Sequence, residues 1–250
     1  MPFSRKKPEI QVGLSGTALK YIAMATMLAD HIGAVLLERI VYYRGNLEQV
    51  AMLMTSQWGD TLYWLWRMLR TVGRIAFPIY CFLLVEGFLH TRDWRRYWLR
   101  MAAFALISEI PFRLAVWNTW AGGSSNVYVE LAIGLLVLRG LKQSEGLTQP
   151  RRAAGMAAVI GGGCLAAVFL KADYDMDGIL IISLFYLLRE KRIVQVMSGG
   201  ILSLLESWNM CYGAGILSAV PLYFYNGKKG QAPWKYAFYW FYPLHLMVLF

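Results

Sequence analysis

The chain has 250 residues, of which 58% are hydrophobic and only 16% are charged, and its mean hydropathy is +0.42. Soluble domains usually carry about 25% charged residues, so this composition excludes an ordinary soluble protein. The net charge of +10 comes without a nucleic-acid-binding motif, and Lys and Arg gather in the cytoplasmic loops of membrane proteins. We therefore expect a multi-pass helical protein that contacts membrane lipid and has no nucleic-acid partner.

Nine apolar segments are expected to be membrane-spanning helices of one domain that covers residues 1–250. They are residues 19–40, 72–90, 98–118, 127–141, 153–170, 175–189, 193–206, 212–226 and 235–250. Several are shorter than the roughly 20 residues of a full crossing, and these could be tilted, broken or re-entrant. The fold class that follows is all-α, a polytopic transmembrane bundle.

The basic residues predict the orientation of these segments. If the N-terminus is inside, the inside connections carry most of the Lys and Arg residues, whereas residues 118–126 have no charge and residues 171–178 are net acidic. The positive-inside rule therefore predicts an inside N-terminus and an outside C-terminus. Residues 41–70 are the exception on the outer side, because they hold several arginine and aromatic residues and could form an interfacial helix.

Ionisable side chains inside the apolar segments are the main functional signal. A charge near the middle of a membrane costs about 2.5–3.5 kcal/mol on insertion scales, and such groups usually face a cavity or a partner. The set comprises Asp30, His31, Arg74, Glu86, Glu109 and His245, with Glu130 and Glu206 nearer the outer ends of their segments.

The first segment places Lys20 and His31 on one helical face, because eleven residues make about three turns. His31 would lie about 16 Å deeper in the membrane than Lys20. Imidazole titrates near neutral pH, so His31 is a candidate general base; the alternative is a histidine with only a structural role in the bundle. Asp30 points about 100° away from His31, and its partner could be His31 or a residue of another helix.

Glu86 and Glu109 are weaker candidates for catalysis, because each could serve only as an ion-pair partner. The basic residues available for such pairs are Arg74 and His90, and Glu86 shares a helical face with His90 four residues later. His245 lies in the aromatic stretch FYPLHL and could belong either to the site or to an interfacial aromatic belt.

No metal site is expected. The stretch DYDMDG, residues 173–178, begins like a calcium-binding EF-hand loop, but its twelfth position is Leu184 instead of the bidentate Glu. The three cysteines lie in or beside apolar runs without C-x-x-C spacing, which is typical of buried apolar side chains.

Five stretches resemble the TraX family. They are ALKYIAMATMLADHIGAVL (18–36), VGRIAFPIYCFLLVEGFLHTRDWRRYWLRMAAFALISEIPF (72–112), ADYDMDGIL (172–180), YNGKKG (225–230) and KYAFYWFYPLHLMVL (235–249). Members of that family are inner-membrane proteins of conjugative plasmids and bacterial chromosomes, and their named activity is N-terminal acetylation of the conjugative pilin subunit. The resemblance implies a bacterial inner-membrane acetyltransferase with acetyl-CoA as donor and a pilin subunit or an envelope acceptor as partner.

The family is also distantly similar to membrane acyltransferases that O-acetylate envelope sugars. Those proteins carry an Arg or Lys, ten residues and then a His in the first span, and Lys20 to His31 has this spacing. The stretch FLLVEGFLHTRDWRRYWLR is similar to their basic cluster, but it has Glu86 where the sugar acetylases usually have Ser. The basic residues of this stretch that match the cluster are Arg92, Arg96 and Arg100.

The resemblance implies a role for each of these residues. Cationic side chains at the cytoplasmic face would dock the phosphates of acetyl-CoA, and this set is Lys20, Arg92, Arg96 and Arg100. His31 would deprotonate the acceptor amine or carry the acetyl group briefly, while Asp30 would tune or orient His31. Glu109 and His245 would complete the catalytic set. The acceptor would be bound by Arg74 and Glu86.

Three other functions fit the same residues. An O-acetyltransferase of an envelope glycan would use the same donor and the same His31. A proton-coupled transporter would also bury Asp, Glu and His, but we find no inverted repeat in the sequence. A non-enzymatic pilus-assembly protein would tolerate the loss of His31.

Overall fold

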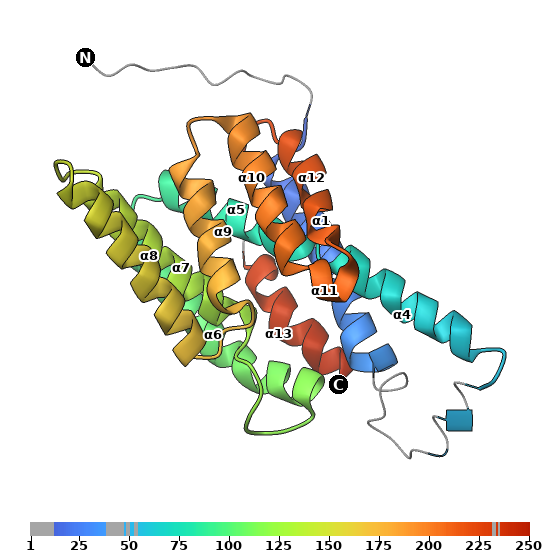
Figure 1. The fold of residues 1–250 in the computed structure, drawn as a ribbon. Coiled ribbons are helices and arrows are strands. Elements are labelled where there is room, and N and C mark those ends of the chain that lie inside the picture. The colour runs from blue at the N-terminus through green and yellow to red at the C-terminus, as the bar shows by residue number, and fades with distance from the viewer. Residues whose placement is uncertain (1–12, 39–47, 49–50, 53–54, 232–233, 235) are drawn as a thin grey trace.

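The computed structural model describes residues 13–38, 48, 51–52, 55–231, 234 and 236–250 (Figure 1). Its helices are α1 (Gly16–His31), η1 (Ile32–Leu37), α4 (Gly59–Gly73), α5 (Ala76–His90), α6 (Trp94–Phe112), η2 (Arg113–Trp117), α7 (Val127–Ser144), α8 (Arg151–Phe169), α9 (Asp175–Leu187), α10 (Arg192–Glu206), α11 (Trp208–Cys211), η3 (Ala214–Ser218), α12 (Ala219–Tyr223) and α13 (Ala237–Leu249). Within this described part, the β-structure consists of one isolated bridge between Leu14 and Tyr225. The all-α expectation is confirmed.

Three helical stretches are long and apolar enough to cross a membrane: Gly16–Leu37, Gly59–His90 and Arg151–Phe169. Two shorter apolar helices cover Ala214–Tyr223 and Ala237–Leu249. Each of the nine expected segments contains helix, with ends that differ from the expected ones by a few residues for most of them. The number of bilayer crossings beyond the three long stretches stays a prediction.

The second expected segment begins earlier in the structure than residue 72. Only Arg74 and Ile75 separate α4 from α5, so the helical stretch extends back to Gly59. Arg67 and Arg70, which we expected in an interfacial helix, therefore belong to the first half of a long helical pair. Most of residues 41–54 lie outside the described part of the chain.

Three helices begin directly after a side chain that accepts a hydrogen bond from a backbone amide of the first turn. The capping residues are Ser15 for α1, Asp93 for α6 and Asn126 for α7. Ser, Asp and Asn are favoured at this position because they satisfy amides that have no partner inside the helix. The caps fix where these three helices start.

The core is centred on α5, which is apolar on nearly all faces and packs against α1, α7 and α9. Phe82, Val85 and Leu84 of α5 are almost fully buried there. Helix α8 differs, because only Gly163 and Ala167 of its residues are buried. One side of α8 packs against α7 and α9 through partly buried residues, and much of the helix is exposed, as expected at the lipid-facing edge of a bundle.

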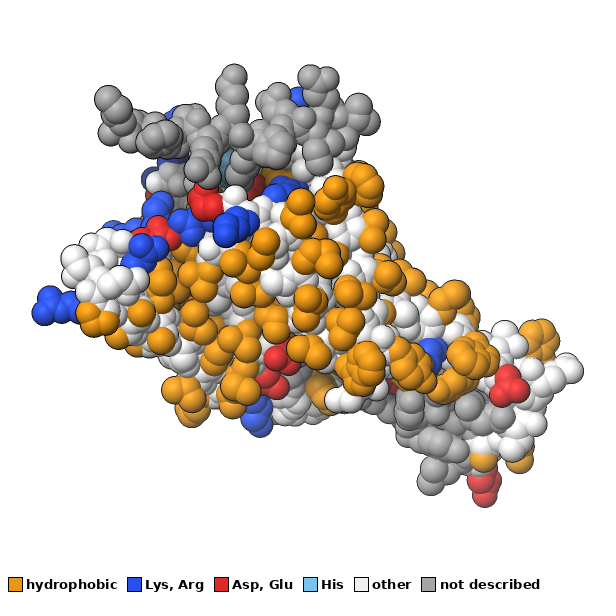
Figure 2. All heavy atoms as spheres, turned by 45° about the horizontal axis from the view of Figure 1, so that its top comes forward, with side chains coloured by type: hydrophobic (Ala, Val, Ile, Leu, Met, Phe, Trp, Pro, Cys, Tyr) orange, Lys and Arg blue, Asp and Glu red, His pale blue; other side chains and the backbone are white. Residues whose placement is uncertain are grey.

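A broad band of exposed apolar side chains covers the face drawn in Figure 2, and Lys and Arg side chains gather along one edge of it. Phe169, Val248, Leu106 and Leu165 are each more than 70% exposed. Exposed apolar area of this extent is unusual for a soluble monomer and is typical of a surface covered by lipid.

Helices α1 and α13 lie side by side near the middle of the molecule and are in contact (Figure 1). Residues 224–230, which lead toward α13, are bound to the start of α1. Leu14 N donates to the Phe224 carbonyl at 2.8 Å, and Gly16 N donates to the Lys228 carbonyl at 2.8 Å. These backbone bonds bring the first and last helices of the described chain together, and the candidate site lies between them.

Candidate active site at a buried histidine pair

His31 and His245 meet in the interior of the protein. His31 is the last residue of α1, His245 lies in α13, and each is 8% exposed. His31 Nδ1 lies 2.6 Å from His245 Nε2, which is hydrogen-bonding distance. A π-helical turn, η1, begins directly after His31, and such turns occur frequently at functional sites.

A backbone carbonyl fixes the proton positions of this pair. His245 Nδ1 lies 2.6 Å from the Phe241 carbonyl oxygen, which can only accept a hydrogen bond. His245 Nδ1 must therefore carry hydrogen, and in a neutral His245 the Nε2 atom is the acceptor. His31 Nδ1 then donates to His245 Nε2, and the lone pair of His31 lies on Nε2. No residue of the described chain forms a hydrogen bond to that His31 Nε2 atom.

Aromatic rings hold the two imidazoles in place. Phe241 stacks on His245 with ring centroids 4.6 Å apart, and Tyr242 contacts His31 edge-on at 5.7 Å. Tyr242 is 2% exposed, so this ring has little freedom to move away. The geometry combines a fixed tautomer with fixed ring planes, as a positioned proton acceptor requires.

Asp30 is bound by two arginines of the neighbouring helical pair. Its Oδ2 atom accepts from Arg70 Nη1 at 2.7 Å, and its Oδ1 atom accepts from Arg74 Nη2 at 3.1 Å. Of the two possibilities that the sequence left open for Asp30, the structure has the contact from another helix. Gly73 makes this approach possible, because a Cβ atom there would overlap the Asp30 carboxylate.

The Asp30 ion pairs extend to two further carboxylates. Arg74 Nη1 lies 3.8 Å from a Glu206 oxygen of α10, and Arg70 Nε lies 3.8 Å from a Glu38 oxygen. The side chains of Asp30, Arg70 and Arg74 are only 10–14% exposed. The network therefore joins α1, α4 and α10 beside the histidine pair.

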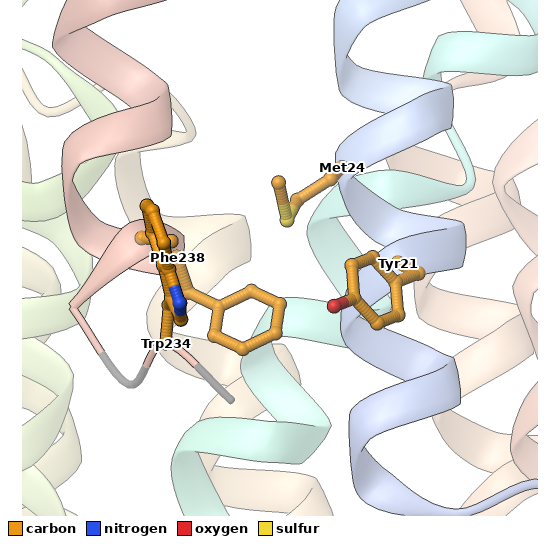
Figure 3. A pocket seen from close by; sticks show the side chains of 5 residues that line it. Tyr21, Met24, Trp234 and Phe238 are labelled. Atoms are coloured by element: carbon orange, nitrogen blue, oxygen red, sulfur yellow. The ribbon is translucent and has the colours of Figure 1, made fainter. Parts of the chain in front are cut away.

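An apolar cleft between α1 and α13 leads to His245. Its main part has a volume of about 700 Å³, and a smaller part of about 270 Å³ adjoins it. The two parts share Met24, Trp234 and Ala237 in their walls. In Figure 3, Tyr21 and Met24 project from α1 toward Phe238 across the smaller part. The lining of the main part includes Leu244 and His245, and His245 is one of the two histidines of the pair.

Two of the four expected cationic residues lie beside the first turn of α13. Lys20 Nζ is 5.0 Å from the centre of the Phe238 ring, and Arg100 lies close to Tyr239. Arg96 is 81% exposed in its side chain and pairs with Asp93 of the same helix at 3.1 Å. Arg92 is also exposed and lies before the start of α6. The structure thus brings Lys20 and Arg100 to α13, and leaves the other two on the surface.

Glu109 belongs to a separate network at the end of α6. One of its oxygens accepts from Arg113 Nε at 2.7 Å, and the other accepts from Asn126 Nδ2 at 2.6 Å. Asn126 is the cap of α7, so Glu109 ties the end of α6 to the start of α7. No contact joins Glu109 to the histidine pair in the described chain.

Glu86 is likewise engaged away from the histidine pair. Its carboxylate accepts a hydrogen bond from the Tyr225 hydroxyl at 3.2 Å, and its backbone carbonyl is bonded to His90 Nδ1 at 2.8 Å. The Tyr225 hydroxyl is the donor of this bond, because an ionised carboxylate can only accept. The Glu86 carboxylate is paired with neither Arg74 nor His90, the two partners considered from the sequence.

Some residues of the site were not singled out from the sequence. Arg70 was placed in an outer segment, although its spacing of four from Arg74 puts both on one helical face. The Phe241 carbonyl and the cleft walls at Trp234 and Trp240 had no sequence signal, because a backbone acceptor and an apolar lining look like ordinary helix. Among the described residues, no group of three His, Cys, Asp or Glu side chains is placed to hold a metal ion.

Comparison with known proteins gives a family match over nearly the whole described chain. The curated protein named "Probable fimbrial assembly protein FimC, serogroup H1" from Dichelobacter nodosus is 29% identical over 236 residues, which cover 82% of this chain and 88% of that protein. No solved structure matches the chain. The family model described as "TraX protein" matches residues 15–250, from the cap of α1 to the end of α13, and the chain belongs to this family.

Proposed function

We propose that this protein is a membrane-embedded acetyltransferase of the bacterial inner membrane. It would move an acetyl group from cytoplasmic acetyl-CoA to an acceptor at the membrane or its outer face, and the acceptor that fits best is the N-terminal amine of a pilin subunit. The observation that carries the proposal is the His31–His245 pair, with its carbonyl-fixed tautomer, at the end of an apolar cleft.

The cleft supports the donor half of the proposal. Lys20 and Arg100 lie beside the first turn of α13, where cationic groups can bind phosphates. From there the apolar walls of Met24 and Trp240 run to His245, as a site for a thioester arm would. His31 follows Lys20 by eleven positions in α1, a distance of about 16 Å along the helix. The cationic end of the cleft and its histidine end are therefore well separated.

The histidine pair supports the chemical half. His31 Nε2, with its free lone pair, takes a proton from the acceptor amine as the nitrogen bonds to the thioester carbonyl carbon. The carbon–sulfur bond then breaks, and His31 gives the proton to the departing sulfur. His245 stabilises the charged His31 ring through the Nδ1–Nε2 hydrogen bond, and the Phe241 carbonyl holds His245 in the accepting tautomer.

The remaining residues receive supporting roles in this proposal. Asp30, with Arg70 and Arg74, positions the end of α1 and hence His31. We give Glu109 and Glu86 structural roles, since their carboxylates are already engaged by other side chains. Arg92 and Arg96 contribute positive charge at the cytoplasmic surface.

The acceptor is suggested by the comparisons. The TraX family is linked to pilin acetylation, and a relative is named as a fimbrial assembly protein. A processed pilin subunit presents its N-terminal amine at or beyond the membrane, whereas acetyl-CoA is cytoplasmic. His31 is the last residue of α1, at the end opposite to the start near Lys20, so in this proposal the acceptor amine approaches the histidine pair from the side of the bundle opposite to the donor phosphates.

The test uses protein purified in detergent, with radiolabelled acetyl-CoA and a candidate pilin peptide. Wild type should release CoA thiol and label the peptide amine, whereas His31→Ala should lower the rate by about 100-fold or more, the usual contribution of a general base. His90→Ala is the matched control, because His90 lies at the end of α5 and its hydrogen bond within the described residues goes to the Glu86 carbonyl. Equal rates for wild type and His31→Ala would sink the proposal. Label recovered on envelope glycan instead of peptide would make the protein an O-acetyltransferase.

A further inference from the structure

The loop of residues 226–230 is hydrogen-bonded to the start of α1. The Lys228 and Lys229 carbonyls accept hydrogen bonds from the Gly16 and Thr17 amides at 2.8 and 2.9 Å. The Thr17 hydroxyl donates a further bond to the Lys229 carbonyl at 2.9 Å. This loop therefore caps α1 with its backbone.

The loop conformation depends on glycine. Gly230 has a φ of +76°, which L side chains rarely adopt, and a Cβ atom there would overlap the hydroxyl of Ser15, the α1 cap. The Asn226 side chain accepts from the Lys228 amide at 2.9 Å and closes a turn at the other end of the loop. Two fixed ends leave the loop with one defined shape.

The lysine side chains of this loop are exposed. Neither Lys228 nor Lys229 forms an ion pair with any residue in the described ranges. Lys20 lies on α1 one turn beyond the Gly16 and Thr17 amides that bind the loop. Three lysines are therefore presented near the start of α1, two of them on a loop whose backbone is hydrogen-bonded to α1.

Aromatic residues follow these lysines closely along the chain. Trp234 follows Gly230 by four residues and is 77% exposed, and Tyr21 follows Lys20 and is 52% exposed. Both line the smaller part of the cleft (Figure 3), which is continuous with the main part that ends at His245. A planar heterocycle can stack on such a ring while the attached phosphates meet cations.

We propose that Lys228 and Lys229, together with Lys20, bind the phosphates of the adenine nucleotide of the donor, and that Trp234 stacks on its adenine ring. This inference rests on the proposed acetyl-CoA-dependent function and moves the main nucleotide contacts from Arg92 and Arg96 to the loop. The same phosphate chemistry occurs in anionic lipid headgroups. The aromatic ring and the continuity with the cleft favour the nucleotide, since a headgroup needs neither.

The first experiment measures binding without requiring turnover. Adenosine 3′,5′-bisphosphate is titrated into wild-type protein in detergent without lipid, and into Lys228→Ala/Lys229→Ala, and the dissociation constants are measured by calorimetry. We expect the double variant to bind at least tenfold more weakly. Arg151→Ala/Lys191→Ala removes the same charge at α8 and before α10, away from the cleft walls, and should bind like wild type.

The second experiment measures thiol release from acetyl-CoA and from acetyl-pantetheine, which lacks the nucleotide. Lys228→Ala/Lys229→Ala should raise KM for acetyl-CoA at least tenfold, with kcat unchanged and with no effect on acetyl-pantetheine. Trp234→Leu should also raise KM for acetyl-CoA, and by a larger factor than it raises KM for acetyl-pantetheine. The lysine variant keeps every backbone bond of the loop, so a comparable melting temperature is expected and is checked.

The outcomes separate the two proposals. The loop site is overturned if the lysine variant binds the nucleotide within twofold of wild type. It is also overturned if the lysine variant loses no more nucleotide affinity than the Arg151→Ala/Lys191→Ala control. A lysine effect seen only with anionic vesicles overturns it in favour of lipid headgroups. If nucleotide binding depends on the loop but His31→Ala is as active as wild type, the nucleotide site is supported and the proposed function is contradicted.

Discussion

At the scale of single residues, one backbone carbonyl determines which ring nitrogens of the two histidines carry hydrogen. The Phe241 carbonyl dictates the hydrogen on His245 Nδ1, and His245 dictates which nitrogen of His31 keeps its lone pair. Histidine–acceptor pairs in other enzymes show how strongly such ordering matters, because the wrong tautomer leaves the base in place but unable to act.

His245→Ala should therefore lower kcat by about tenfold or more while KM for acetyl-CoA changes little, because His31 keeps its position in α1 but loses its acceptor. His245→Asn should recover part of the rate, since an amide oxygen can accept from His31 Nδ1. The measurement is steady-state thiol release at saturating and limiting donor. A rise in KM with kcat preserved would mean that His245 acts only as a wall of the cleft.

The Asp30 ion pairs make a second prediction at this scale. Asp30→Ala removes the carboxylate that forms the shortest ion pairs of Arg70 and Arg74. Both guanidinium groups are nearly buried, so losing this partner should lower the free energy of unfolding by about 3 kcal/mol. The midpoint of thermal unfolding in detergent measures this change. The control is Arg96→Ala, whose pair with Asp93 is exposed and should add almost nothing to stability. Equal midpoints for the two variants would show that the network is not structural.

At the scale of elements, the contact between α1 and α4 depends on a missing side chain. A Cβ atom at Gly73 would occupy the space of the Asp30 carboxylate, so Gly73→Val should push α4 away and separate Asp30 from Arg74. We expect a lower unfolding midpoint and loss of acetyl transfer. Gly161→Ala on α8 is the control, because nothing lies within 4 Å of its Cβ position, and alanine in a helix should be neutral or stabilising by about 0.5–1 kcal/mol. Full activity in Gly73→Val would contradict the close approach.

The elements themselves could be predicted well from the sequence, because apolar runs of helical length dominate it. The expected segment 127–141 corresponds to α7 at Val127–Ser144, and 193–206 corresponds to α10 at Arg192–Glu206. The start of α4 was missed because its polar and aromatic residues resemble an interfacial segment more than a buried one.

The candidate site could be predicted only in part. Depth in an apolar segment singled out His31 and His245, and the structure brings them together. The same reasoning could not pair Asp30 with Arg70, nor direct Glu109 to Asn126, because partners in different helices depend on packing and not on spacing along the chain. The cleft could not be predicted from the sequence either, because its apolar walls have the composition of any lipid-facing helix.

At the scale of the whole molecule, the distribution of charge predicts how the protein lies in the membrane. Residues 145–150 precede a basic start of α8, whereas residues 118–126 carry no charge. The positive-inside rule therefore predicts that residues 145–150 lie in the cytoplasm and residues 118–126 lie outside.

Single cysteines test this orientation in a variant in which Cys81, Cys164 and Cys211 are replaced by alanine. In inner-membrane spheroplasts, a membrane-impermeant maleimide should label Thr119→Cys without lysis and Thr148→Cys only after lysis. Retained acetyl transfer by the parent variant is the control for folding. Labelling in the reverse order would invert the orientation and place the cleft mouth outside, away from acetyl-CoA.

The ion pairs of Asp30 also constrain how the protein is made. Asp30 and His31 enter the membrane on the first helix, yet Arg70 follows 40 residues later and His245 follows 214 residues later. During synthesis α1 therefore holds an aspartate and a histidine in an apolar setting before their partners exist, a situation that costs several kcal/mol. Synthesis of α4 supplies the counter-charges for Asp30 early, whereas the partner of His31 is made only with α13, near the end of the chain. Membrane insertion of α1 is thus coupled to the helices that follow it, and assembly of the bundle is completed when His245 reaches His31.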